Sequence, residues 1–417
     1  MSLSRSFEAR VESARLRIGD LSSLRRLVAL SSERDVTRRQ WHAIELQLSA
    51  TEARLQSRLK RAADQYLGRV DEIRIARRLN AVLGEIELDL SRSFTFFDTY
   101  MDVLSQRHLD ALGSPLAGCD VLAWDAIKRD HPALRIVEPP LVFCDRGFGA
   151  SIIRESVLLP DGTPNPVPLI QIPYARLREK CNLTSVFHEA GHQALVRLGL
   201  VMTLPVVLRA ALARARASDA IADLFALWSS EIGPDLWTFS ASGLAAAAGI
   251  REVLALPPNH VFRISWTDPH PPPYLRVLLS FECCRQEWGR GPWESWETEW
   301  KALYPLEGVS PETGTLLAEG VQCIPVIARA LLTTRFRALN GRTIPELFDL
   351  RALAPWALEQ RAATAREGAL RLSGLSPGAQ LAVFRVVKEH GWYPESVLDR
   401  VMTQWLIQLG RRRPYLH

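Results

Sequence analysis

The stretch that decides the fold is SVFHEAGHQAL, residues 185–195. It places His188 and His192 four positions apart, with Glu189 directly after the first histidine. A separation of four puts both imidazoles on one face of a helix, one turn apart, close enough to bind one metal ion. Glu189 lies about 100° further around the helix, where a carboxylate can accept a proton from a bound water. The stretch therefore predicts a metal-binding helix with its own general base.

A structural helix that happens to carry two histidines is the other interpretation of this stretch. In a chain with nine histidines, the spacing H-E-x-x-H arises by chance on the order of once per hundred such sequences, which favours the metal site. The apolar residues around the motif give the helix a hydrophobic face under either interpretation. Acidic ligands elsewhere in the chain decide between the two.

A pair of acids lies in SDAIADLFALW, residues 218–228. Asp219 and Asp223 are four positions apart, so one carboxylate can bind the ion while the other accepts a hydrogen bond from a ligating imidazole. The apolar residues between and after them predict a helix that packs inward. A solvated pair of surface aspartates is the alternative. We expect Asp219 to be the third ligand and Asp223 the orienting group, with Asp223 as the alternative ligand.

Three short motifs in order, HEAGH, DAIADLFA and DPHPPPYLR, resemble those of the gluzincin metallopeptidases of the heat-shock membrane peptidase and CAAX-prenyl protease group. The resemblance covers roughly residues 167–280 and is confined to these motifs. It implies a zincin-like catalytic domain with zinc bound by His188, His192 and Asp219, and with Glu189 as the base. It also implies that Asp223 orients a ligand. The third ligand of that family is usually a glutamate, one methylene longer than Asp219.

The third motif supplies candidates for the opposite wall of the cleft. By the resemblance, His270 and Arg276 lie there. A zinc ion with three protein ligands lowers the pKa of a bound water to about 7, and attack on a peptide carbonyl then creates an oxyanion that needs a donor. His270 is the leading candidate for that donor, with Tyr174 and Tyr274 as alternatives. Arg276 is expected to brace the loop or pair with an acid.

The chain divides into three regions by amino-acid composition and by the spacing of its apolar residues. An almost Gly- and Pro-free stretch with apolar residues at helical spacing predicts a helical N-terminal arm or bundle. Short β-like runs before the motif helix predict a small sheet, and most of the sequence after that helix has helical spacing. The predicted fold is mainly α with a small β-sheet, an α+β class. The expected domains are a helical arm at 1–115, a zincin-like metallopeptidase domain at 116–300 and a helical C-terminal region at 301–417.

Composition limits the class of protein. A chain that is 47% hydrophobic and 23% charged has the balance of a globular protein and excludes a disordered or fibrous one. The cysteines are scattered without a disulfide or zinc-knuckle spacing, and the N-terminus lacks the apolar core of a signal peptide. The longest apolar run contains Pro205 and Arg209, so no membrane-spanning segment is predicted. We therefore expect a cytoplasmic protein.

Positive charge gathers in the N-terminal arm. Residues 1–80 hold 17 Lys and Arg against 10 Asp and Glu. These charges are interleaved and few aromatic residues accompany them, which is typical of a solvated helical face rather than of a nucleic-acid surface. A nucleic-acid partner is therefore not favoured, a regulatory protein partner is open, and the oligomeric state is not determined.

The short strand VPLIQIP, residues 167–173, comes directly before the motif helix. Zincin-like peptidases present an edge strand to an extended substrate at this place, so a peptide could add to it through main-chain hydrogen bonds. The predicted function is a zinc-dependent endopeptidase that acts on a protein or peptide substrate. The alternative is a non-catalytic, metal-stabilised scaffold that binds nucleic acid or an acidic protein through its basic N-terminal helices.

Overall fold

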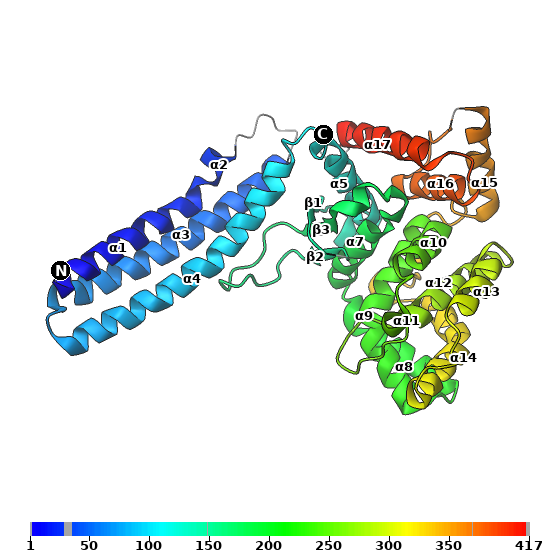
Figure 1. Cartoon of the computed structure of the whole chain (residues 1–417), viewed down its shortest axis with the longest axis horizontal. Coiled ribbons are helices and arrows are strands. Elements are labelled where there is room, and N and C mark those ends of the chain that lie inside the picture. The colour runs from blue at the N-terminus through cyan, green and yellow to red at the C-terminus, as the bar shows by residue number, and fades with distance from the viewer. Residues whose placement is uncertain (1, 29–35, 148, 369, 414–417) are drawn as a thin grey trace.

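The computed structural model describes residues 2–28, 36–147, 149–368 and 370–413. Most of these residues are helical, and three short strands form one sheet. The prediction of a mainly α fold with a small β-sheet is confirmed. Figure 1 shows an elongated helical arm at the N-terminal end, the small sheet beside it, and a larger helical body that includes α17.

The arm is built from long amphipathic helices that lie side by side (Figure 1). Its elements are α1 (Leu3–Gly19), α2 (Leu24–Leu27), α3 (Arg38–Tyr66) and α4 (Ile73–Gln106). Helix α3 starts with a capping box, in which Thr37 and Gln40 each accept a hydrogen bond from the other's backbone N–H. Apolar residues three, four or seven positions apart, such as Ile44, Leu48 and Leu55, are buried between the helices.

The sheet has the strand order β1-β3-β2. Strand β1 (Leu141–Asp145) pairs in parallel with β3 (Leu169–Pro173), and β2 (Ser151–Ile153) pairs with β3 in the antiparallel sense. Strand β3 therefore has a neighbour on both sides. The expectation that this strand offers an edge to substrate is wrong, because its main-chain groups are already paired; β2 is the free edge on that side of the sheet.

Alternate residues of the sheet belong to two different hydrophobic cores. Leu141, Phe143 and Leu169 pack with the helices of the arm. Val142 and Ile170 face the other way and pack with the helical body. The sheet is thus a layer between the two parts of the molecule, and it places its second face against the motif helix.

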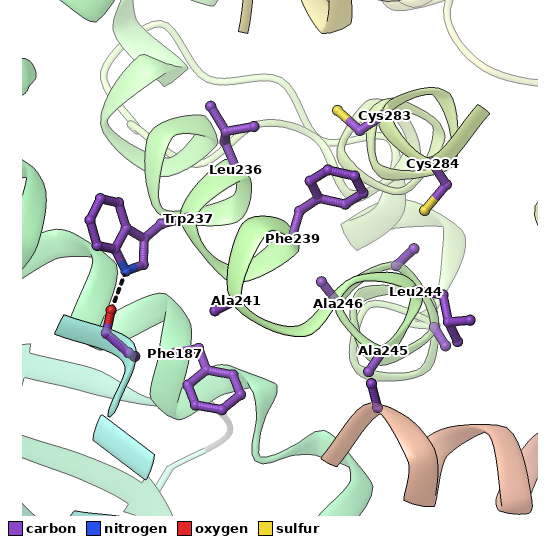
Figure 2. Packing of buried hydrophobic residues seen from close by; sticks show 14 of the residues in the cluster. Phe187, Leu236, Trp237, Phe239, Ala241, Leu244, Ala245, Ala246, Cys283 and Cys284 are labelled. Atoms are coloured by element: carbon purple, nitrogen blue, oxygen red, sulfur yellow. Dashed lines mark hydrogen bonds between the residues drawn. The ribbon is translucent and has the colours of Figure 1, made fainter. Parts of the chain in front are cut away.

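The helical body has one continuous core. Its residues run from Leu116 to Leu409, so the C-terminal region shares the interior of the predicted catalytic domain. Figure 2 shows part of this core, where Trp237 donates a hydrogen bond to the carbonyl oxygen of Ala126 over 2.9 Å. Its helices are α5 (Gly113–Ile127), α6 (Pro132–Arg135), α7 (Thr184–Arg197), α8 (Leu204–Arg214), α9 (Asp219–Ser242), α10 (Leu244–Val253), α11 (Pro258–Val261), α12 (Pro273–Trp288), α13 (Trp293–Leu303), α14 (Pro311–Thr333), α15 (Pro355–Ala362), α16 (Pro377–Glu389) and α17 (Glu395–Arg412).

One helix in the described part of the chain, α14, is long and apolar enough to cross a membrane by length and composition. The stretch Lys180–Arg197 together with Leu200–Arg214 passes the same test as a pair bent by 90°. The expectation of no membrane-spanning segment stays a prediction, because length and composition alone do not distinguish a span from a core helix. In the structure α14 packs against α8, α9 and α12, and 44% of its most apolar stretch is buried. Buried helices of globular cores share these properties.

Candidate metal centre

Helix α7 carries the H-E-x-x-H motif with its two faces clearly divided. Val186, Phe187 and Ala190 are fully buried in the core of the helical body. The opposite face carries His188 and His192, whose ring centroids lie 4.9 Å apart. The apolar residues between the polar ones thus fix the rotation of the helix, and this rotation turns both imidazoles toward the same side.

A third side chain reaches the two histidines from helix α9. Glu231 Oε2 lies 3.1 Å from His188 Nε2, and Glu231 Oε1 lies 3.6 Å from His192 Nε2. One ligand atom from each of the three residues falls within 4.8 Å of the others. Zinc ligands at tetrahedral positions are separated by about 3.3 Å, so the two measured separations fit such an ion. Two imidazoles and one carboxylate are also a donor set that zinc takes in hydrolases.

Asp235 orients the first histidine. It lies four residues after Glu231, one turn along α9, and its Oδ1 is 2.9 Å from His188 Nδ1. Arg276 holds the same carboxylate through Nε and Nη2, at 2.6 and 2.8 Å. A carboxylate on Nδ1 leaves Nε2 of His188 as the nitrogen that could bind a metal ion, and it would make this imidazole a stronger ligand.

Asp219 and Asp223 do not reach the paired histidines. Asp219 is the first residue of α9 and is exposed. It lies twelve residues before Glu231, a distance of about 18 Å along a helix. Asp223 is also exposed and forms an ion pair with Arg209 of α8. The expected roles of the two aspartates, ligand and orienting group, therefore pass to Glu231 and Asp235.

The sequence carries a signal for Glu231 and Asp235 that the motif comparison does not capture. Both acids lie in SSEIGPDLW, residues 229–237, with the same spacing of four as Asp219 and Asp223 on the same helix. A glutamate is also the usual third ligand of the family that the motifs resemble. DAIADLFA matches the family pattern over more residues than SSEIGPDLW does. This longer match led to the prediction of Asp219, although a glutamate is the more usual ligand.

Gly191 allows α7 and α9 to approach closely at the site. A Cβ atom at this position would lie 3.0 Å from Trp237 Cβ and 3.1 Å from Pro234 Cα, tighter than ordinary contacts. Pro234 lies inside α9, between Glu231 and Asp235, and its ring leaves one helical hydrogen bond unmade. The small residue on one helix and the irregular turn on the other thus bring the glutamate within reach of the imidazoles.

The pKa values at the site follow from burial and from the two acids. Burial disfavours a charged His188, but hydrogen bonds with Asp235 and Glu231 outweigh this and raise its pKa to about 9. The same burial, together with the charge of His188, lowers the pKa of His192 to about 4. The two acids on His188 thus favour positive charge at this place in the structure.

Glu189 lines a cleft beside the three candidate ligands. Its side chain is buried, and burial raises the pKa of its carboxyl group, with the positive charge of His188 acting in the opposite direction. Among the described residues, no hydrogen bond engages this carboxylate. A carboxylate with a raised pKa and no internal partner is suited to accept a proton from water.

His270 and Arg276 lie at the same cleft, as the resemblance implied. His270 Nε2 is 3.8 Å from Glu231 Oε2, and its Nδ1 is 2.7 Å from Asp268 Oδ1. Its side chain is 60% exposed, so it is free to contact a substrate. Tyr174 and Tyr274 do not line the cleft; Tyr274 is buried beside Phe262. His270 thus remains the candidate for an oxyanion donor.

The cleft has a volume of about 250 Å³. One wall comes from α7 and the segment before it, another from α10, and Gly149 and Ala150 close it near strand β2.

Comparison of the sequence with family models and with curated proteins, and of the chain with solved structures, finds no match. The geometry of this site is therefore what bears on the function of the chain.

Proposed function

We propose that the protein is a metal-dependent hydrolase, a zinc endopeptidase. The observation that carries this proposal is the convergence of His188, His192 and Glu231 from two helices, with the buried carboxylate of Glu189 beside them. A purely structural metal site needs no such fourth group. When bound, zinc would act as a Lewis acid and lower the pKa of a coordinated water to about 7.

The residues of the site have separable roles in this chemistry. The ion would be held by His188 Nε2, an imidazole nitrogen of His192 and a carboxylate oxygen of Glu231. Glu189 accepts a proton from the attacking water and returns it to the leaving amine. Nδ1 of His270 donates to Asp268, so His270 donates from Nε2 to the developing oxyanion when its imidazole is doubly protonated. The role of Glu189 as a base is in line with its burial, which raises the pKa of its carboxyl group and so makes the carboxylate a stronger proton acceptor.

The substrate class is supported by the position of the free sheet edge. Strand β2 is paired on one side only, and the two residues before it, Gly149 and Ala150, line the cleft. An extended peptide could add to β2 through main-chain hydrogen bonds and run into the cleft. Endopeptidase activity follows from such pairing, because recognition along the backbone needs no chain end.

The alternative of a non-catalytic scaffold with a nucleic-acid-binding arm receives less support. Several basic side chains of the arm already pair with acids of the arm. Arg17 binds Glu87 with both terminal nitrogens, and Arg58 binds Glu85 and Asp89. Paired guanidinium groups contribute less to binding of phosphates than free ones.

Exchange of Glu189 for glutamine tests the proposal. Glu189→Gln should keep its metal, because the carboxylate is not a ligand, and should lose about 100-fold or more in the rate of protein cleavage. The measurements are metal content by atomic absorption and cleavage of an unfolded protein such as reduced casein. Glu312→Gln, at an exposed position of α14, is the matched control and should behave like wild type.

Three results would reject different parts of the proposal. A wild-type protein that binds no divalent metal ion rejects the metal centre. A metal-loaded Glu189→Gln variant with full activity leaves the centre intact and removes the assigned base. A metal-loaded wild type without hydrolytic activity favours the scaffold alternative.

A further inference from the structure

Arg176 is a buried cation in the same cleft that the proposed chemistry does not use. It lies in the short 3-10 helix Tyr174–Leu177, directly after β3, and its side chain is only 5% exposed. It lines the cleft together with Asn182, Thr184 and Ser185. A buried guanidinium needs compensating partners, because transfer of a charge out of water is costly.

The partners of Arg176 are insufficient for a buried charge. Its Nη1 lies 3.3 Å from Glu179, whose own side chain is 54% exposed. Its Nε is buried and has no hydrogen-bond partner. Among the described residues, the guanidinium forms no other hydrogen bond. Burial lowers the pKa of Arg176, and the charges of Glu179 and Glu252 offset this only in part.

Two other buried arginines, Arg107 and Arg385, have more partners, although Nε of Arg385 is likewise buried without a hydrogen bond. Arg107 binds Asp120 through two nitrogens, at 2.7 and 3.1 Å, and also donates to the carbonyl of Val142. The carboxylate of Asp120 is itself buried. Arg176 thus differs from Arg107 in lacking a buried acid from the protein. A carboxylate of a bound ligand would supply the negative charge that Arg176 lacks.

The surroundings of Arg176 fit a carboxylate next to an apolar group. The hydroxyl groups of Thr184 and Ser185 and the positive end of α7 lie at this end of the cleft. Apolar side chains also line the cleft: Ile250 and Val253 of α10, and Leu254 directly after it. Thr184 precedes His188 by one turn, about 6 Å along the helix. An extended peptide covers that length with about two residues.

We propose that Arg176 binds a carboxylate of the peptide substrate, close to the bond that is cleaved. The carboxylate is either the side chain of an acidic residue or the C-terminal group of the peptide; the second case would make the enzyme a carboxypeptidase in place of an endopeptidase. Its oxygens accept hydrogen bonds from the terminal nitrogens of Arg176, because Nε is enclosed by the protein and is not within reach of the cleft. This inference rests on the proposed function, since it assigns the substrate class of that site.

Two pairs of peptides test the inference on the wild-type protein. The first pair is a mixed-sequence peptide library with a free C-terminal acid and the same library with a C-terminal amide. The second pair consists of two peptides that differ only by glutamate or glutamine at one internal position. The zinc-loaded protein should cleave one carboxylate form at least tenfold more efficiently than its neutral counterpart, mainly through a lower KM. The pair that shows the difference identifies the source of the carboxylate. Equal efficiency within both pairs would overturn the inference.

Substitution of Arg176 tests the residue assignment. Arg176→Met should abolish the preference, whereas Arg178→Met should keep it. Arg178 is the matched control because it lies two residues away and its side chain is 84% exposed. If thermal denaturation shows that Arg176→Met does not fold, Arg176→Lys replaces it. Lysine keeps the charge but lacks the fork, so the preference should fall at least threefold. A folded variant at position 176 with an unchanged preference would contradict the assignment.

A binding measurement separates this inference from the proposed function. Fluorescently labelled peptides of both forms are titrated with the Glu189→Gln variant, and affinity is read from fluorescence anisotropy. The carboxylate form should bind at least tenfold more tightly, whether or not the wild type cleaves it. Preferential binding without cleavage would remove the hydrolase and keep the anion subsite. Cleavage without preferential binding would keep the hydrolase and remove the anion subsite.

Discussion

At the scale of single residues, the site shows which contacts a sequence can reveal. His188, Glu189 and His192 are related by local helical spacing, so their arrangement was predictable. Glu231 comes from another helix and lies 43 positions after His188 in the chain. Its selection over Asp219 depends on how far α9 slides along α7. The sequence of α9 alone does not determine its position along α7. Two pairs of acids one turn apart occur on α9, and either pair could have faced the histidines.

Replacement of the third candidate ligand distinguishes the two acids. Glu231→Gln should lose metal at equimolar zinc, because an amide is a poor ligand and the imidazole pair alone binds weakly. Asp219→Asn should keep a full equivalent of metal. Zinc content after gel filtration provides the measurement, with the wild type as reference. Retention of zinc by Glu231→Gln together with its loss from Asp219→Asn would reverse the assignment.

At the scale of elements, the packing of α7 on α9 brings the candidate ligands together. The helical character of both segments followed from their apolar spacing, and the presence of a small sheet was also predictable. The strand order was not, because β3 carries apolar residues on both faces and nothing in its sequence distinguishes a central strand from an edge. Gly191 is recognisable in the sequence as a small residue near the metal, but its contact with Trp237 and Pro234 belongs to the helix interface.

Enlargement of Gly191 should separate the two helices. In Gly191→Val the added atoms meet Trp237 and Pro234, which should destabilise the fold by about 1–3 kcal/mol. Zinc affinity should fall as well, because Glu231 moves away from the imidazoles. Urea denaturation and zinc competition with a chelator measure the two effects. Gly314→Val provides the control, since no atom lies within 4 Å of a Cβ atom there. An unchanged zinc affinity in folded Gly191→Val would show that the interface tolerates the change.

At the scale of the whole molecule, the C-terminal helices complete the core of the region that carries the site. Arg385 of α16 is fully buried and binds Glu252 of α10 at 2.6 Å. It also donates to Asn182, which lies just before α7. The helical nature of residues 301–417 followed from their sequence pattern. Their sharing of one interior with the preceding region did not, because it depends on contacts such as Arg385 with Glu252, 133 positions apart.

The pair formed by Glu252 and Arg385 makes stability depend on pH. Burial acts against ionisation of Glu252, but the charge of Arg385 and hydrogen bonds from Lys388 and Arg385 lower its pKa from 4.5 to about 2. A lowered pKa in the folded state stabilises the protein fully above pH 4.5, and this contribution disappears as pH falls from 4.5 to 2.

Substitution of Glu252 measures this contribution. At pH 7, Glu252→Gln should lower the free energy of unfolding by on the order of 1 kcal/mol, a modest effect because solvent screens the partly exposed carboxylate. The difference from wild type should shrink at pH 3, as urea denaturation at both pH values would show. Glu367→Gln, whose side chain is 70% exposed, should match wild type throughout. A difference that is equally large at both pH values would contradict the lowered pKa.

The sheet between the two cores makes the N-terminal arm an integral part of the protein rather than an appendage. Proteolytic removal of the arm would leave Leu141, Phe143 and Leu169 exposed to water on one face of the sheet. The remaining fragment would expose an apolar surface on the face of the sheet opposite α7, and it would tend to aggregate. The chain must therefore be kept whole for its cleft to remain in shape.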